Sequence, residues 1–342
     1  MDITMESKIK WGLMGSGSIV DKWICGAKQL NDMEIVAISS RTIESAQRMA
    51  QKYNISVALE YEALVKRTDI DVVYIPVPHT AHKELAIMAM EHGKSVLVEK
   101  PACVNENELI EVLECAKKNN VFFMEGMWTR FFPIMNKIKS LFNDEGIGEV
   151  RAMNMAFSFR LPVELRDQRW MNPELAGGGL LDAGVYNLHF AEEILGKYPV
   201  ALTGYATIDS DDYHIQVDEQ ASYIAKYDKG ELVVMSSGVR TDMLDVAMIY
   251  GTQGYIEVPS FWKPTLINVM KDGKITTYEE NIPQRVEGIN DDGFQYEIAH
   301  VNECIRKNLK ESPIMTWKQS LSIIRQCDDL RRQWGLKYPF ED

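Results

Sequence analysis

The order of apolar and polar positions divides the chain into two parts with different patterns. In the first part, short apolar runs alternate with amphipathic stretches in which apolar residues recur every three or four positions. This alternation is typical of βαβ units that build a parallel sheet. The predicted strands are Ile9–Met14, Glu34–Ser40, Val72–Val77, Ser95–Val98 and Val121–Met124, and the helices between them include Glu44–Tyr53, His82–His92 and Glu106–Asn119.

After Gly146-Ile147-Gly148 the pattern changes to longer runs in which apolar and polar residues alternate. Regular helical spacers are missing there, so this part predicts a mostly antiparallel sheet. The predicted strands are Val150–Phe159, Gln220–Tyr227, Leu232–Val239, Val246–Ile249 and Tyr255–Val258, and the predicted helices are Leu180–Leu195, Phe294–Lys307 and Trp317–Trp334. We expect an α/β chain of two domains, residues 1–126 and 127–342, with the C-terminal segment packing back on the first.

The composition argues against several kinds of partner. A formal net charge of −13 disfavours nucleic acid, because phosphate contacts depend on clustered Lys and Arg. Residues 1–10 lack a signal-peptide core, and no stretch approaches the roughly 20 apolar residues of a membrane span. The five cysteines show no CxxC spacing, so neither a disulfide framework nor a zinc site is predicted. We expect a cytoplasmic protein without nucleic-acid or membrane partners.

The segment that follows the first predicted strand carries a partial dinucleotide fingerprint. It also opens a helix, which is the context that this motif requires. Gly15 allows a tight turn, and Gly17 lets the backbone approach a pyrophosphate, which then rests on the helix N-terminus at Ser18 and Ile19. Val20 replaces the third glycine of the fingerprint, which affects only helix packing. A purely structural glycine turn is the alternative, and the context favours a dinucleotide site.

The end of the second predicted strand decides which dinucleotide is expected. An NAD site offers Asp or Glu there for the ribose hydroxyls, whereas this chain offers Ser39-Ser40-Arg41-Thr42. Ser40 carries no carboxylate that would repel a 2′-phosphate, and Arg41 can pair with such a phosphate through two hydrogen bonds. The sequence therefore predicts NADP, with NAD still possible. The alternative is a solvated arginine at a helix start.

The fourth long apolar run ends abruptly in Glu99-Lys100-Pro101. Ligands of open parallel sheets bind at the carboxyl ends of the strands, so Lys100 is expected to point its ammonium into that crevice. Pro101 disfavours the helical region for Lys100 and so restricts its direction. By itself the Glu-Lys pair is more typical of a surface ion pair.

Besides the glycine fingerprint, the chain contains the motifs Val77-Pro78-His79-Thr80-Ala81-His82, Glu99-Lys100-Pro101 and Gly251-Thr252-Gln253-Gly254-Tyr255-Ile256. With these motifs the chain resembles the Gfo/Idh/MocA oxidoreductases, the glucose-fructose oxidoreductase and inositol dehydrogenase family, over nearly its whole length. Two further segments are Glu125–Pro133 and Gly177–Tyr186. They resemble in particular the dimeric dihydrodiol dehydrogenase branch, which also contains NADP-dependent xylose dehydrogenases.

This resemblance implies a Rossmann domain, a C-terminal α+β domain with a large open sheet, and a homodimer formed through that sheet. It also implies that Pro78, His79, His82 and Glu99, together with Lys100, lie at the cofactor. His79 and His82 alone could suggest a metal pair, but no third ligand lies at usable spacing, so no metal is predicted. A role at a helix start is the alternative for the two histidines.

Asp182 and Tyr186 are four residues apart and so share one face of a helix, and His189 lies three further along. Spacing alone favours a packing role, whereas the resemblance implies catalysis for Asp182 and Tyr186. Oxidation of an alcohol needs a base, and a neighbouring ammonium such as Lys100 lowers the pKa of a phenol from its usual value near 10. Our hypothesis is that Tyr186 and Lys100 accept the proton while Asp182 orients the substrate or the lysine. The sequence leaves open which of the two carries the proton.

Several residues are predicted to line the substrate pocket. Trp128 and Arg130 follow the fifth strand and should lie at the same crevice, where an indole can form an apolar wall. Arg169-Trp170 and Trp262 lie in predicted loops of the second domain and could close the pocket. Packing between the domains is the alternative for the aromatic residues that follow Arg130.

These inferences predict an NADP-dependent oxidoreductase. Its substrate is expected to be a secondary alcohol or carbonyl of a sugar, a polyol or a trans-dihydrodiol. Two alternatives keep the fold: glycosidase-type chemistry without net redox change, and an NADP-binding regulator that has lost catalysis. Retention of Lys100, Asp182 and Tyr186 disfavours the regulator.

Overall fold

The computed structural model describes residues 7–143, 145–165, 168–208, 216–286 and 291–341, so the polar start of the chain, residues 1–6, lies outside it. Contacts group the chain into two compact units. The first contains Met1–Cys103, Asn107–Trp128 and Ile282–Ser320, and the second contains Val104–Glu106, Thr129–Asn281 and Leu321–Asp342. The main boundary follows Trp128, and a late segment of the chain returns to the first unit.

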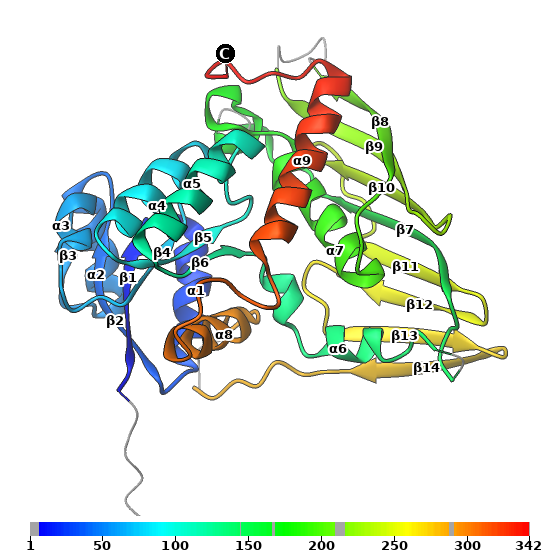
Figure 1. Ribbon diagram of the computed structural model, residues 1–342, viewed down its shortest axis with the longest axis horizontal. Coiled ribbons are helices and arrows are strands. Elements are labelled where there is room, and N and C mark those ends of the chain that lie inside the picture. The colour runs from blue at the N-terminus through cyan, green and yellow to red at the C-terminus, as the bar shows by residue number, and fades with distance from the viewer. Residues whose placement is uncertain (1–6, 144, 166–167, 209–215, 287–290, 342) are drawn as a thin grey trace, which may run out of the picture. The chain divides into compact units, whose positions relative to one another are not determined.

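The first unit contains a sheet of six parallel strands in the order β3-β2-β1-β4-β5-β6 (Figure 1). Its central strands are mostly apolar and are buried on both faces, as in Val72–Ile75. The strands are β1 (Ile9–Met14), β2 (Met33–Ser39), β3 (Ala58–Leu59), β4 (Val72–Ile75), β5 (Ser95–Glu99) and β6 (Phe123–Gly126).

The order of these strands fixes where a ligand can bind. After β3 the chain returns to the other side of β1, so right-handed crossovers put the earlier and the later helices on opposite faces. The crevice between the carboxyl ends of β1 and β4 is then the switch point of the sheet. The helices of this unit are α1 (Ser18–Lys28), α2 (Ile43–Tyr53), α3 (Tyr61–Val65), α4 (His82–Glu91), α5 (Glu106–Asn119) and α8 (Phe294–Arg306).

The second unit contains an eight-stranded sheet in the order β14-β13-β12-β11-β7-β10-β9-β8 (Figure 1). All its neighbouring strands are antiparallel except β7 and β10. The strands are β7 (Val150–Ser158), β8 (Ala201–Ile208), β9 (Asp218–Lys226), β10 (Leu232–Gly238), β11 (Val246–Gly251), β12 (Gly254–Pro259), β13 (Leu266–Lys271) and β14 (Lys274–Glu279).

Helices cover one face of the eight-stranded sheet. α7 (Val185–Leu195) packs on β7 and β10, and the C-terminal part of α9 (Trp317–Trp334) reaches β8, where Trp334 Nε1 donates to Gly204 O at 3.0 Å. α6 (Ile134–Lys139) contacts β13. Side chains alternate along the strands between this buried face and an exposed one, which explains the polar-apolar alternation in the sequence.

The predicted fold class is confirmed, and the differences are local. The segment Leu180–Gly184 forms a wider π-helical turn ahead of α7 rather than a plain α-helix. The prediction missed β3 at the edge of the six-stranded sheet, and β8, β13 and β14 towards the two ends of the eight-stranded sheet. Edge strands bury little apolar surface, so their patterns give a weak signal.

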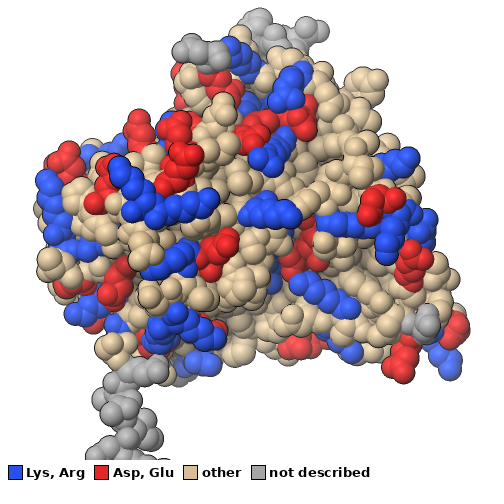
Figure 2. Space-filling view, viewed as in Figure 1, with Lys and Arg blue, Asp and Glu red and all other residues tan. Residues whose placement is uncertain are grey.

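The surface of the described residues carries both signs of charge. On the face drawn in Figure 2, Lys and Arg are interspersed with Asp and Glu and form no large patch of one sign. None of the described helices is long and apolar enough to cross a membrane.

Candidate active site

The turn between β1 and α1 has the shape of a dinucleotide cradle. The Gly15 N–H donates to Ser39 O at 2.9 Å, and a Cβ on Gly15 would lie 2.8 Å from Pro76 O, so packing itself requires glycine. At Gly17 a Cβ would meet only Pro76 O, at 3.8 Å, so packing does not explain that glycine. As the N-cap, Gly17 offers no side chain to the first N–H groups of α1, those of Ser18 and Ile19. The residues present therefore fit a bound pyrophosphate.

The end of β2 lies against this turn. The hydroxyl groups of Ser16 and Ser40 form a hydrogen bond of 2.8 Å, which connects the end of the second strand to the glycine turn. Arg41 follows as an exposed side chain beside Tyr61. Burial raises the pKa of Tyr61, and the positive charge of Arg41 opposes that shift. No carboxylate stands between Ser39 and Thr42 in the sequence.

The exits of β4 and β5 are held together by His82. This side chain is fully buried, and its two ring nitrogens lie 2.8 Å from Pro101 O and 2.9 Å from Val77 O. His79 is buried as well, with its ring centroid 5.8 Å from that of His82. Among the described residues no group of three or more His, Cys, Asp and Glu could hold a metal ion. His82 thus fixes backbone geometry at the crevice, and its predicted cofactor contact stays a prediction.

The backbone at Lys100 is fixed by Glu99. Glu99 Oε1 accepts the Tyr74 hydroxyl at 2.5 Å, and Oε2 accepts the Lys100 N–H at 3.3 Å. Lys100 itself is half-buried at the carboxyl end of β5, and its peptide bond to Pro101 is cis. Glu297 of α8 was not predicted as a site residue from the sequence. Burial, and then the negative charge of Glu99, raise the pKa of its carboxyl well above its usual value.

Trp128 is the last residue of the first unit before the chain enters the second. Its ring stacks on that of Phe294 with a centroid distance of 4.4 Å and an angle of 15° between the planes. Only 5% of the residue is exposed. Packing against α8 accounts for this indole, and its role as a pocket wall stays a prediction.

In the second unit, Asp182 forms an ion pair. Asp182 lies in the π-helical turn and is buried, and its Oδ1 accepts Arg169 Nη1 at 2.9 Å. The Arg169 guanidinium also lies over the Trp170 ring, 4.9 Å from its centroid. The predicted residues Asp182, Arg169 and Trp170 are therefore together, although Asp182 lies 12 positions after Trp170 in the sequence.

Tyr186 belongs to a cluster of aromatic rings. The edge of one ring meets the face of the other between Tyr186 and Phe157, at 5.2 Å between centroids. Phe157 in turn stacks on Trp262 at 5.4 Å with planes 6° apart, and Trp262 Nε1 donates to Asp245 at 3.2 Å. The sequence analysis named Tyr186 and Trp262 but missed Phe157. The only signal for Phe157 was its position near the end of a long strand.

Arg130 is engaged inside the second unit. Its Nη2 donates to His189 Nδ1 at 3.2 Å, and its Nη1 donates to Glu193. Lys139 also donates to Glu193, from a more exposed position. The Arg130 side chain is 1% exposed, and the ion pair with Glu193 explains how its charge can be buried there. Contact of Arg130 with a substrate stays a prediction.

The two units hold different parts of the predicted site. The predicted cofactor residues all lie in the first unit, at or near the carboxyl ends of β1, β2, β4 and β5. Lys100 belongs with them, whereas Asp182 and Tyr186 belong to the second unit.

Comparison with known proteins gives matches along the whole chain. Residues 9–127 match the oxidoreductase family with the NAD-binding Rossmann fold, and residues 135–257 match the GFO/IDH/MocA C-terminal domain. A trans-1,2-dihydrobenzene-1,2-diol dehydrogenase from Xenopus laevis is 35% identical over 341 residues, covering 96% of this chain and 99% of that protein.

Two solved structures share the fold at low sequence identity. The aldose-aldose oxidoreductase from Caulobacter crescentus has a TM-score of 0.84 and 21% identity, covering 95% of this chain and 97% of its own. A 3-ketoreductase from Actinomadura kijaniata, in complex with NADP and TDP-benzene, has a TM-score of 0.82 and 21% identity, covering 96% and 98%.

Proposed function

Because the chain belongs to the Gfo/Idh/MocA family of oxidoreductases, we propose that it transfers hydride between NADP and a secondary alcohol or carbonyl of a sugar, a polyol or a trans-dihydrodiol. The observation that carries the proposal is that the two units hold different groups needed for the reaction. The first unit has a dinucleotide cradle after β1 and Lys100 at the end of β5, two strands away, and the second has a paired carboxylate and a tyrosine beside aromatic rings.

The first unit supplies the residues that hold the cofactor. The N–H groups of Ser18 and Ile19 would hold the pyrophosphate, and Arg41 would pair with the 2′-phosphate. Pro78 and His79, on the strand end next to the glycine turn, would also contact the cofactor. When bound, the nicotinamide ring supplies the carbon that accepts or donates hydride.

Lys100 and Tyr186 together handle the proton of the substrate hydroxyl. An ammonium near a phenol favours the phenolate, so the pair can accept a proton when the alcohol is oxidised and return it when a carbonyl is reduced. Asp182, which Arg169 holds in place, orients the hydroxyl or the lysine.

The second unit supports a ring-shaped substrate. Phe157, Trp262 and Tyr186 form contiguous aromatic surface, which binds either an unsaturated ring or the apolar face of a sugar. Arg169, paired with Asp182, adds hydrogen-bond donors in the same unit. A trans-dihydrodiol combines an unsaturated ring with vicinal hydroxyls, and the relative from Xenopus laevis is named for such a substrate.

A substrate panel tests the proposed function. Purified protein is mixed with NADP and either trans-1,2-dihydrobenzene-1,2-diol, D-xylose, D-glucose or myo-inositol, and NADPH formation is followed by absorbance. We expect turnover of at least one member, and the preferred member identifies the substrate class. Tight NADP binding without turnover in either direction would contradict the proposal and favour the regulator.

Replacing Arg41 with alanine should change the cofactor preference. The 2′-phosphate loses a charge-assisted partner, so we expect NADP to bind about 10- to 100-fold more weakly. Affinity for NAD should stay within about twofold, because NAD has no 2′-phosphate. Titration of intrinsic tryptophan fluorescence measures both affinities. Arg48→Ala is the matched control on α2, where Arg48 donates to Ser45; equal losses in both variants would contradict a specific role for Arg41.

We also propose a homodimer formed through the outer face of the eight-stranded sheet. Four large residues on neighbouring strands expose 42–89% of their surface there. The register places Ile224 opposite Val234, so these side chains share one face. A contiguous apolar face of this kind is typical of a protein interface. The four residues are Tyr205, Ile224, Leu232 and Val234.

Replacing Ile224 with glutamate should dissociate this dimer. Each interface would then bury two carboxylates within apolar surroundings, which is unfavourable. We expect wild-type protein to sediment as a dimer in analytical ultracentrifugation and the variant to sediment as a monomer. Lys229→Glu, in the exposed turn after β9, is the control and should remain dimeric. A wild-type monomer, or a dimeric Ile224→Glu variant, would contradict the proposed interface.

The cytoplasm is the proposed location of the protein. All five cysteines are free thiols, which is typical of a reducing compartment. Cell fractionation tests the proposal, and recovery of the protein outside the cytoplasm would contradict it.

A further inference from the structure

A buried carboxyl group lies beneath the turn that carries Asp182. Asp218, the first residue of β9, is fully buried. Its Oδ2 accepts the Leu180 N–H at 2.6 Å. Its Oδ1 has no hydrogen-bond partner among the described residues and lies 2.2 Å from the position that a Cβ on Gly178 would take. The carboxyl group is therefore enclosed against the backbone of Gly177-Gly178-Gly179, which we call the glycine segment.

Asp218 contacts the backbone at Leu180 and at Gly178, and both positions lie at the start of the π-helical turn that precedes α7. Leu180 begins the π-helical turn, and the Gly178 carbonyl accepts the Asp182 N–H at 3.3 Å. Gly178 has a φ of +125°, a conformation that favours glycine, and any side chain there would collide with Asp218. The chain thus keeps this position open for the carboxyl group.

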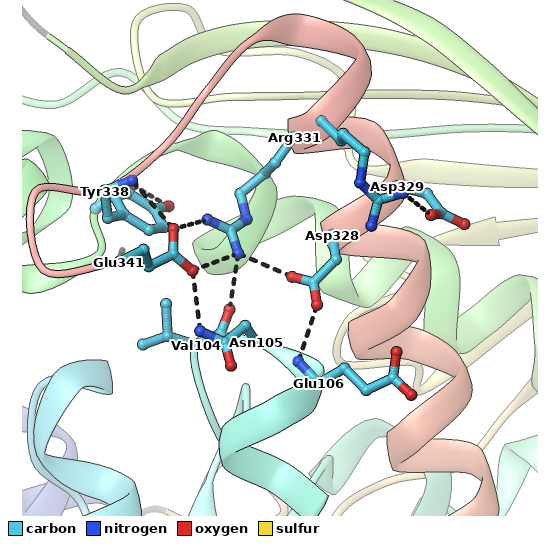
Figure 3. A network of polar contacts seen from close by, with 10 residues as sticks. Val104, Asn105, Glu106, Asp328, Asp329, Arg331, Tyr338 and Glu341 are labelled. Atoms are coloured by element: carbon cyan, nitrogen blue, oxygen red, sulfur yellow. Dashed lines mark hydrogen bonds and ion pairs between the residues drawn. The ribbon is translucent and has the colours of Figure 1, made fainter.

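The C-terminal tail supports the same segment. The Tyr338 hydroxyl donates to Gly177 O at 2.8 Å, and the Arg331 guanidinium lies 4.8 Å from the centre of the Tyr338 ring. Arg331 also pairs with Glu341 through two hydrogen bonds, of 2.7 and 3.0 Å (Figure 3). Figure 3 shows Arg331 between Asp328 and Glu341, with Tyr338 beside it. Two independent elements therefore hold the glycine segment.

The charged groups around Asp218 come from three elements. Burial raises the pKa of Asp218 to about 7, and Asp182 on the π-helical turn adds to this rise. Backbone N–H groups, chiefly that of Leu180, and the Arg331 guanidinium of α9 oppose it. Two buried phenols, Tyr223 on β9 and Tyr338 in the tail, also interact with Asp218 and stay neutral at physiological pH because burial raises their pKa.

Asp218 costs stability where it is ionised. The pKa of Asp218 in the folded protein, about 7, exceeds the ordinary value of 3.8, so the folded state binds more protons than the unfolded state between these limits. Stability from this group is therefore lost as the pH rises towards 7. A buried acid that destabilises the fold and contacts a catalytic turn is a candidate for a functional role.

We propose that Asp218 is a positioning residue, whose carboxylate holds the turn that places Asp182 and Tyr186 for the reaction. The inference rests on the proposed function. An ionised carboxylate accepts a backbone N–H more strongly than a neutral carboxyl does and is favoured at a helix N-terminus. The negative charge of Asp218 also raises the proton affinity of Asp182 at the start of the helix. Activity therefore falls when Asp218 takes up a proton.

The test compares wild-type protein with Asp218→Asn between pH 5.5 and 9, using the preferred substrate of the panel. Asparagine keeps an oxygen for the Leu180 N–H and nearly the same volume, but carries no charge. Wild-type kcat should fall on the acidic side with a midpoint near pH 7. In the variant the fall centred near pH 7 should vanish, leaving only the fall that protonation of the Tyr186-Lys100 base produces, and kcat at pH 8.5 should be about tenfold lower. The Tm at pH 8.5 should be unchanged or raised, a result that a purely structural role does not predict.

Glu192→Gln is the matched control. Burial raises the pKa of Glu192 to about 7 as well, and Glu192 lies on α7 but hydrogen-bonds Ser322 and Gln326 rather than the glycine segment. The acidic limb should persist in this variant. Loss of the limb in Glu192→Gln but not in Asp218→Asn would overturn the proposal. So would a wild-type profile without the limb, a test that holds even if Asp218→Asn fails to fold.

Other outcomes separate this inference from the proposed function. Normal turnover and an unchanged pH profile in Asp218→Asn would overturn the role of Asp218 alone, since the enzyme would still work. A parallel fall of kcat and Tm in that variant would show that Asp218 only supports the fold. Absence of turnover in wild-type protein would overturn the proposed function and this inference with it.

Discussion

Replacing Lys100 with methionine or Tyr186 with phenylalanine is expected to lower kcat by about 10³-fold, within the range of general acid-base catalysis. Methionine keeps most of the length of the lysine without its charge, and phenylalanine keeps the ring without the hydroxyl. NADP affinity should remain within about twofold, because the cradle at Gly15 and Gly17 is untouched. Steady-state kinetics and fluorescence titration measure the two effects separately.

The double variant shows whether the two residues act as a unit. Groups that share one proton transfer are not additive, so the double variant should lose little more than the worse single variant. Lys66→Met is the control, since Lys66 forms an exposed ion pair with Glu62 in the first unit. Near-normal turnover in both single variants would end the proposed roles of Lys100 and Tyr186.

Replacing Arg130 with methionine should destabilise the protein by about 3–5 kcal/mol, the usual cost of removing one partner of a buried ion pair. The side chains of Arg130 and Glu193 are 1% and 6% exposed. Without the guanidinium, Glu193 keeps only the more exposed Lys139 as a charged partner. Urea denaturation followed by tryptophan fluorescence measures the loss.

Lys139→Met is the matched control for Arg130. It removes the other cation that pairs with Glu193, but the Lys139 side chain is 43% exposed, so we expect a loss below about 1 kcal/mol. Equal effects in the two variants would contradict the assignment of Arg130 as the main partner. A rise in KM with unchanged stability in Arg130→Met would instead restore its predicted role in the substrate pocket.

Much of the first unit could be predicted from the sequence because parallel strands bury both faces. Val72–Ile75 is apolar throughout, and a charged or glycine-rich segment at the end of such a run marks the crevice. This reasoning located Gly15, Gly17 and Lys100 with few assumptions. It also predicted β1, β2, β4, β5 and β6 in their order along the chain, but missed the short β3 and α3.

The supporting residues of the second unit could not be predicted in the same way. Asp218 meets Leu180 across 38 residues, and Phe157 meets Tyr186 across the space between β7 and α7. Such contacts depend on how distant elements pair, which local periodicity does not record. The same reason explains Arg130, whose place after a strand suggested the crevice although its guanidinium packs against α7.

Deuterium transfer tests the central claim, hydride transfer to NADP, most directly. The preferred panel substrate is labelled with deuterium on the carbon that carries the reacting hydroxyl. It is incubated with the protein and NADP, and the mass of the NADPH formed is measured by mass spectrometry. The account predicts NADPH heavier by one deuterium, and a matching loss of label from the oxidised product. A substrate that is converted while its label stays in the product or passes to water, with no labelled NADPH, would contradict it.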